Sequence, residues 1–268
     1  MTHILIPTDF SEGSLHAIRF ALDAFGTEGT EFILLHSVGD VPRQPLLPEY
    51  IDDLKRNGRE ELREFADKCR ALRPTERLNL VSVVDIGSVF AAIERVYKER
   101  EVHAVVLGAR GKGEAELWGT QTTSVVKNST RPVIVVPTEW KAGHIAHILY
   151  ADDRAYVHKQ RTLIMLVELA KRHKARITLA HVRVNMDEPL SPSEVAMHAG
   201  WFDGVEHTTL VVPGADVTER LMGLAAGGEY DMIAVLHRDL NWFDELFHGS
   251  VAKRMALHTT VPLLVLQE

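Results

Sequence analysis

Short runs of aliphatic and β-branched residues alternate along the chain with longer segments in which apolar residues recur every three or four positions. The short runs are typical of strands buried inside a parallel sheet, and the longer spacing is typical of helices. In the first half the pattern predicts strands at 3–7, 31–38, 78–84, 103–107 and 133–136. Between them it predicts helices at 11–25, 49–72 and 88–98, and a fourth that opens at Gly119-Thr120. This order of elements predicts a doubly wound α/β fold on five parallel strands.

The same pattern then begins again in the second half of the chain. IAHILYADD matches HILIPTD, which places Asp153 opposite Asp9, and ARITLAHV matches EFILLHSV. The offset between matching positions is about 145 residues in the early strands and about 130 in the late ones. One deletion, of most of the helix predicted at 49–72, explains that change. The sequence therefore predicts a tandem repeat of two similar domains, 1–141 and 142–268.

A glycine-bearing loop joins the fourth predicted strand to the fourth predicted helix. Gly108 and Gly111 interrupt the apolar pattern, and Gly119 precedes the helix, with Thr120 or Thr122 as the candidate N-cap. A glycine loop that leads into a helix N-terminus exposes backbone N–H groups and the positive end of the helix dipole, which suits phosphate. The loop is not a Walker A motif, because its lysine is followed by glycine instead of serine or threonine.

The chain resembles the universal stress protein family across nearly its whole length. The stretches that carry the resemblance are ILIPTDFSEGSLHAIRFAL, LLHSV, RPVIVVP and HGSVAKRMALHTTVPLLVL. The nucleotide-binding signature of that family is Gly, two residues, Gly, nine residues, Gly and then Ser or Thr. Here the longer spacing holds seven residues, Lys112 to Trp118. The resemblance implies an adenine nucleotide alpha hydrolase-like sheet in each domain. It also implies that some members bind ATP or another adenine nucleotide and that others do not.

The resemblance assigns roles to residues of the first domain. It implies that Asp9, beside Pro7 and Thr8, contacts the nucleoside at the edge where open α/β sheets bind ligands. It implies that the backbone of Ser37 holds the adenine. The residues expected to hold the phosphates, with Mg²⁺ as a possible companion, are Gly108, Arg110, Gly111, Gly119 and Thr120. A turn or capping role for Asp9 is the alternative.

The second domain departs from the signature. His237 and Leu240 stand where the first two glycines are expected, and only Gly249-Ser250 is retained. Asp239 and other acidic residues bring negative charge to the place where phosphates would lie, and aromatic residues make the loop bulky. Because steric and electrostatic effects agree, we expect no ATP in the second domain.

Composition narrows the class of protein. A net charge of −7 argues against nucleic acid as the main partner. One cysteine excludes an intrachain disulfide and suits a reducing cytoplasm. No apolar run reaches the roughly 18 residues of a membrane helix, and the N-terminus does not have the pattern of a signal peptide. The 14 histidines lack the spacing of a metal site, so no metal is expected.

Three functional hypotheses follow. The first is a cytoplasmic regulatory protein of the universal stress class that binds ATP in its first domain and thereby biases contacts with an unidentified protein partner. The second is an interaction protein with no nucleotide and a relic loop. The third is a slow ATP hydrolase or phosphotransferase, although the loop shows no clear general base. Under all three hypotheses the last strands of the two domains are expected to pair as an intrachain pseudo-dimer, with a higher homo-oligomer left open.

Overall fold

The structure is a computed structural model that describes residues 1–38, 48–109, 120–151, 160–183, 200–214, 217–237 and 261–267. The chain divides into two compact units, Met1–Thr138 and Glu139–Glu268, here called the first and second domains. The boundary expected from the sequence, between residues 141 and 142, lies three residues further along. The pairing of the two last strands as a pseudo-dimer stays a prediction.

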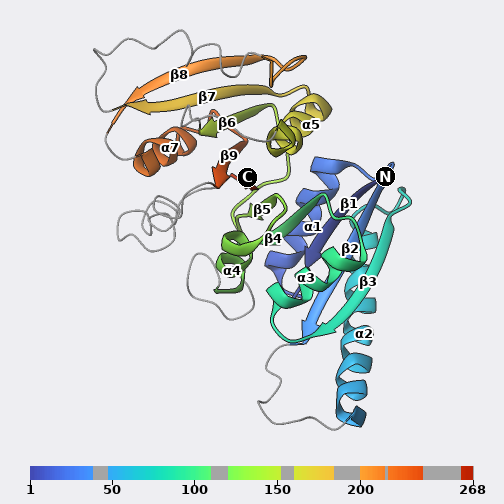
Figure 1. Cartoon of the computed structure of the whole chain (residues 1–268). Helices are drawn as coiled ribbons and strands as arrows, with labels where there is room; N and C mark the ends of the chain where they lie inside the picture. Colours follow the sequence, from blue (N-terminus) through green and yellow to red (C-terminus); the bar gives the residue numbers. More distant parts are fainter. Residues whose placement is uncertain are drawn as a thin grey trace. The chain divides into compact units, whose positions relative to one another are not determined.

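The first domain contains a five-stranded parallel sheet with the strand order β3-β2-β1-β4-β5. Its elements, shown in Figure 1, are β1 (Thr2–Pro7), α1 (Glu12–Phe25), β2 (Thr30–Val38), α2 (Pro48–Ala71), β3 (Asn79–Ile86), α3 (Val89–Glu99), β4 (Ala104–Gly108), α4 (Thr120–Asn128) and β5 (Val133–Val136). Right-handed crossovers place α1 and α2 on one face and α3 and α4 on the other, and α3 packs against α4. The α/β fold predicted from the sequence is confirmed.

The core of the first domain forms around its central strands. Ile4, Leu5 and Ile6 of β1 have no exposed surface, because helices cover both faces of the sheet. Helix α1 begins after Ser11, whose side chain accepts a hydrogen bond from the backbone N–H of Ser14, as an N-cap does. These local signals fix where β1 ends and α1 begins, and so they position the turn between the two elements.

The second domain repeats this arrangement with the strand order β8-β7-β6-β9-β10, again all parallel. Its described elements are β6 (His147–Ala151), the 3-10 helix η1 (Gln160–Leu163), α5 (Ile164–His173), β7 (Arg176–Arg183), β8 (His207–Pro213), α7 (Val217–Ala226), β9 (Met232–His237) and β10 (Leu263–Gln267). The sequence predicted one helix from about residue 158 to residue 172. The described part of that segment instead begins with the 3-10 turn.

At the amino-terminal edge of the first sheet, two hydrogen bonds of a histidine at the start of β1 link it to the segment before β4. The backbone N–H of His3 donates to Nδ1 of His103 at 3.1 Å. Nδ1 of His3 in turn donates to the carbonyl of Glu101 at 2.8 Å. These bonds tie the start of β1 to the chain that enters β4.

The second sheet has a matching pair of histidine hydrogen bonds at its own amino-terminal edge. Nδ1 of His147 donates to the carbonyl of Glu229 at 3.0 Å. The backbone N–H of His147 donates to Oδ2 of Asp231 at 2.9 Å, so a carboxylate takes the place of the imidazole acceptor. The two domains therefore share a contact between strands as well as a strand order, which is what an internal duplication produces.

The single cysteine, Cys69, is predicted to be unreactive in the folded protein. Its side chain has no exposed surface on α2, and burial raises the pKa of the thiol to about 12, so the thiolate is scarce at neutral pH. We expect no labelling by a thiol reagent under native conditions and complete labelling in denaturant. Fast labelling of the native protein would contradict the burial of α2 against the sheet.

A buried hydroxyl gives a prediction for the second domain. Thr162 is 5% exposed, and within the described part of the chain its Oγ1 has no hydrogen-bond partner. Replacing an unsatisfied buried hydroxyl by a methyl group of the same shape is neutral or stabilising, so Thr162→Val should stabilise the domain by up to about 1 kcal/mol.

The matched control is Thr178→Val, measured by the same denaturant unfolding experiment. Thr178 is also 5% exposed, but its hydroxyl lies 2.7 Å from Nε2 of His147. This substitution should cost about 1 kcal/mol, because it removes a hydrogen bond from the half-buried imidazole ring of His147. Equal effects of the two substitutions would contradict the different environments of the two hydroxyls.

Candidate functional site

The carboxyl-terminal edge of the first sheet contains the point where the strand order reverses. β1 pairs with β2 on one side and with β4 on the other. From β1 the chain continues to β2, and from β4 it continues in the opposite direction, to β5. Open α/β sheets bind ligands in the crevice outside such a switch point. The sequence places Pro7, Thr8 and Asp9 at this edge, and the structure agrees, since β1 ends at Pro7.

Asp9 is held by the start of helix α1. Its Oδ1 accepts the hydroxyls of Ser11 at 2.5 Å and Ser14 at 2.7 Å, and the backbone N–H of Ser11 at 3.1 Å. The structural role considered for Asp9, that of a turn residue beside a helix cap, is therefore present. The same bonds fix the carboxylate at the carboxyl-terminal edge of the sheet, so the structural role and a binding role are compatible.

The main chain of Ser37 faces the space beyond the end of β1. The carbonyl of Leu35 accepts the N–H of Thr8 at 2.8 Å, so Leu35 faces β1. Residues two apart in a strand turn their backbone groups to the same side. Ser37 therefore directs its N–H and C=O past Thr8, where the chain has already turned away toward Asp9. These groups form a hydrogen-bonding edge beside the switch point.

An aromatic cluster lies next to this edge. The backbone of Phe10 lies in the left-handed region, with φ of 65°, which turns its ring over His36 at a centroid distance of 4.3 Å. Phe65 of α2 meets the ring of Phe10 edge-on at 5.7 Å. Nδ1 of His36 donates to the carbonyl of Thr8 at 3.0 Å and ends the pairing of β1 with β2. The sequence did not single out Phe10 or His36 as part of a site.

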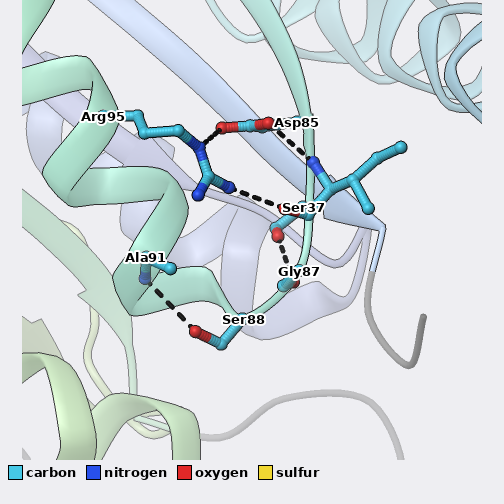
Figure 2. Close-up of polar contacts among 7 residues, drawn as sticks. Ser37, Asp85, Gly87, Ser88, Ala91 and Arg95 are labelled. Carbon is cyan, nitrogen blue, oxygen red and sulfur yellow. Dashed lines mark hydrogen bonds and ion pairs between the residues drawn. The ribbon is translucent and has the colours of Figure 1, made fainter. Parts of the chain in front are cut away.

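A polar network joins the end of β2 to the turn between β3 and α3, as Figure 2 shows. The hydroxyl of Ser37 donates to the carbonyl of Gly87 at 2.6 Å, and the N–H of Gly87 donates to the carbonyl of Val38 at 3.0 Å. Nε of Arg95 donates to Oδ2 of Asp85 at 2.5 Å, and Nη2 of Arg95 donates to the carbonyl of Ile86 at 2.6 Å. The turn between β3 and α3 is thereby bonded to the end of β2 on one side and to α3 on the other.

The charge state of Asp85 keeps this network intact. Burial acts to raise the pKa of Asp85, but the hydrogen bonds from Arg95 and from the N–H of Ile86 outweigh it and hold the pKa below its usual value. A lowered pKa stabilises the folded state at pH values above the unfolded-state pKa. That contribution is lost as the pH falls through the folded-state pKa. The pair is therefore ionised at neutral pH.

Gly108, at the end of β4, has a packing requirement of its own. A Cβ at this position would lie 2.6 Å from the carbonyl oxygen of Gly13 in the first turn of α1. The carbonyl of Gly108 accepts the hydroxyl of Thr122 at 3.1 Å. Thr122 therefore lies inside α4 and anchors it to β4, and it is not the N-cap. The glycine at 108 is explained by contact between β4 and α1, whether or not phosphate lies nearby.

Most of the other residues expected to hold the phosphates lie outside the described part of the chain. Arg110, Gly111 and Gly119 belong to segment 110–119, which the structure does not describe. The helix opens at Gly119-Thr120 as the sequence predicted, but Thr120 is the first residue of α4 and so, like Thr122, is not its N-cap.

The comparisons with known proteins agree with this geometry. The model of the universal stress protein family matches residues 1–137 and 191–267. The chain belongs to the universal stress protein family. The match covers the carboxyl-terminal edge of the first sheet and all the candidate site residues.

Some universal stress proteins match the whole of this chain, and others match about half of it. A crystal structure from Archaeoglobus fulgidus matches 99% of this chain and 96% of its own, with a TM-score of 0.67 and 17% identity, and so shares the fold of both domains. Universal stress protein MJ0577 of Methanocaldococcus jannaschii is 25% identical over 151 residues, which are 50% of this chain and 93% of that protein. A second solved structure is a universal stress protein in complex with cAMP; it has 19% identity and a TM-score of 0.41, and the match covers 51% of this chain and 97% of that chain.

The second domain of this universal stress protein has a different candidate feature. A cavity of about 270 Å³ lies at the amino-terminal edge of its sheet and is lined by Trp140, His144, Tyr230 and Asp231, among others. The loop predicted to be degenerate, with Gly249 and Ser250, and Asp153 lie outside the described residues. The cavity is at the opposite edge of the sheet from His237, the last residue of β9, and nothing in the residue pattern indicated it.

Two other features concern metals and membranes. In the ranges that the structure describes, no three histidine, cysteine or acidic side chains are grouped so that they could hold a metal ion. None of the described helices combines the length and the apolar character that crossing a bilayer requires.

Proposed function

We propose that this universal stress protein binds one adenine nucleotide, ATP or a close relative, in its first domain, and that the bound nucleotide biases contacts with a protein partner. One observation carries the proposal. The N–H and C=O of Ser37 face the space past the end of β1, beside the fixed carboxylate of Asp9. A donor and an acceptor side by side on one strand match the hydrogen-bonding edge of a purine base.

Each part of the crevice would then have its own role. The main chain of Ser37 would hold the base, and Asp9, beside Pro7 and Thr8, would accept from the ribose. The phosphates would run toward the N-terminus of α4 at Thr120, with Gly108, Arg110, Gly111 and Gly119 along their path. Backbone N–H groups and the helix dipole favour anions there, and Mg²⁺ would offset part of the phosphate charge.

Family membership supports the choice of ligand class. A universal stress protein has been solved in complex with cAMP, so proteins of this family can hold an adenine nucleotide. No described residue stands out as a general base in this crevice. We therefore propose binding and regulation in preference to turnover.

The test is direct. The purified protein is heated, and the supernatant is chromatographed for nucleotides; the nucleotide-free protein is then titrated with ATP by calorimetry. We expect an adenine nucleotide in the supernatant and a stoichiometry of about one per chain. Absence of a nucleotide, together with a flat titration, would favour the interaction-protein hypothesis.

The short loop gives a prediction about which adenine nucleotide binds best. Only seven residues, Lys112 to Trp118, separate Gly111 from Gly119, two fewer than the family signature has. A shorter loop leaves less room for a triphosphate, so AMP or ADP should lose less affinity than ATP relative to proteins with the longer loop. Calorimetry with the three nucleotides measures this. Tight binding with a strong preference for ATP would contradict it.

A further inference from the structure

The proposed site depends on two residues at the very end of a strand. Ser37 and Val38 are the last residues of β2, and β1 has already ended beside them, so β3 alone among the described strands pairs with them. Strand ends that are supported on one side open easily. A backbone edge that is to recognise a base must nevertheless keep its geometry before the ligand arrives, since ordering on binding lowers affinity.

The polar network of Figure 2 supplies the missing support. The hydroxyl of Ser37 and the carbonyl of Val38 both bond to Gly87, whose φ of 109° marks a turn that other residues rarely adopt. The turn is held from behind by Arg95, which bonds to the carboxylate of Asp85 and to the carbonyl of Ile86.

The second domain provides an internal comparison. Its strands β7 and β8 pair in the same register, and Val182 and Val212 occupy the places of Ser37 and Asp85. The seventh residue of the helix that follows is Gly223, in the place of Arg95. The glycine of the turn is retained as Gly214, and Arg220 of α7 lies against it, but the hydroxyl and the carboxylate of the network are replaced by valine side chains.

This contrast shows that the fold does not require the polar network. Both domains form the same parallel sheet with the same strand order, so Ser37, Asp85 and Arg95 are not required for the sheet itself. The hydroxyl and the carboxylate occur in the domain that keeps the glycine loop and have valines in their places in the other domain, where the arginine beside the glycine comes from a different position of the helix. We infer that Ser37, Asp85 and Arg95 are positioning residues that lock the end of β2, so that its main chain selects adenine over other purine bases. This inference rests on the proposed function.

The experiment compares ATP with inosine triphosphate, which has an oxygen in place of the 6-amino group of adenine and so reverses the donor and acceptor on that edge. Calorimetry is done with both nucleotides on the wild-type protein, Ser37→Ala and Arg95→Gln. We expect the wild type to prefer ATP. Each variant should lose about tenfold in ATP affinity, and the ratio between the two nucleotides should shrink toward one.

Two control variants separate positioning from general stability. Ser37→Thr keeps the hydroxyl and should bind within about twofold of the wild type. Arg100→Gln makes the same change at the end of α3, where the guanidinium pairs with Glu31 at 3.4 Å, at the opposite edge of the sheet. It should leave both affinities unchanged. Hydrogen exchange should show faster exchange of the Gly87 amide in Ser37→Ala and Arg95→Gln only.

The outcomes are distinguishable. If the wild-type protein binds neither nucleotide, the proposed function fails, and this inference fails with it. If the wild type prefers ATP and the variants weaken both nucleotides equally, the network has a structural role only, and the inference alone is overturned. Unchanged affinities in Ser37→Ala and Arg95→Gln overturn it as well.

Discussion

Gly108→Ala is expected to destabilise the first domain by about 2–3 kcal/mol, the usual cost of forcing extra atoms into a packed core. The new Cβ would lie 2.6 Å from the carbonyl oxygen and 2.7 Å from the carbonyl carbon of Gly13. These are backbone atoms of α1, so no side chain can rotate away and β4 or α1 must shift. The substitution therefore tests the contact that aligns the switch point with the first turn of α1.

The same substitution at Gly223 is the matched control and should have the opposite sign. Gly223 lies inside α7, and a Cβ there would meet no atom within 4 Å. Alanine is preferred over glycine in a helix by about 0.8–1 kcal/mol, so Gly223→Ala should stabilise the second domain slightly.

Denaturant unfolding measures both variants, and accessibility of Cys69 reports on the first domain alone, because the single thiol lies on α2. Gly108→Ala should expose Cys69 at lower denaturant than the wild type does, and Gly223→Ala should leave that transition in place. Tolerance of Gly108→Ala would mean that β4 and α1 are further apart than described.

Gly119→Val is expected to lower ATP affinity more than 100-fold, while Gly249→Val changes it by less than about threefold. Helix α4 begins at Thr120, so a branched side chain at 119 would stand in front of the N–H groups that favour phosphate. Gly249 is the matching residue of the second domain, where His237, Asp239 and Leu240 replace the open loop. Bulk and negative charge already oppose a phosphate there.

Calorimetry on the two variants decides between the domains. Loss of binding in Gly249→Val with retention in Gly119→Val would place the site in the second domain. Retention in both variants would place the nucleotide away from both helix starts. Thermal unfolding is measured in parallel, because replacing a glycine can also cost stability through the backbone.

Much of the fold followed from patterns that are local in the chain. The alternation of apolar runs with three-to-four spacing predicted the strands and helices, and the helices predicted to start at residues 11 and 88 have Ser11 and Ser88 as their N-caps. The repeat was visible because a duplicated domain keeps the same alternation. Such signals depend on neighbours within a few residues, so a single sequence contains them.

The site depended on contacts between distant segments. Sequence reasoning explained Gly108 by phosphate, but Gly13, far away in the chain, is what excludes a side chain there. It also missed Asp85 and Arg95, although an aspartate at the end of a β-branched run and an arginine two turns into a capped helix are visible signals. The contact that these two residues support, between Ser37 and Gly87, depends on the register of β2 and β3, which the sequence does not give.

By itself, the sequence determined the α/β alternation, the duplication, the strand ends at Pro7 and Val38 to within a residue or so, and the uneven retention of glycines between the two loops. Only the tertiary structure decided that the Ser37 main chain points past the end of β1 and that Gly87 and Arg95 hold the end of β2, while hydrogen bonds to the start of α1 fix the Asp9 carboxylate. The physical reason is that side-chain periodicity records which face of an element is buried. Which strand ends meet, and which backbone groups are left without a neighbouring strand, depends on strand order and register.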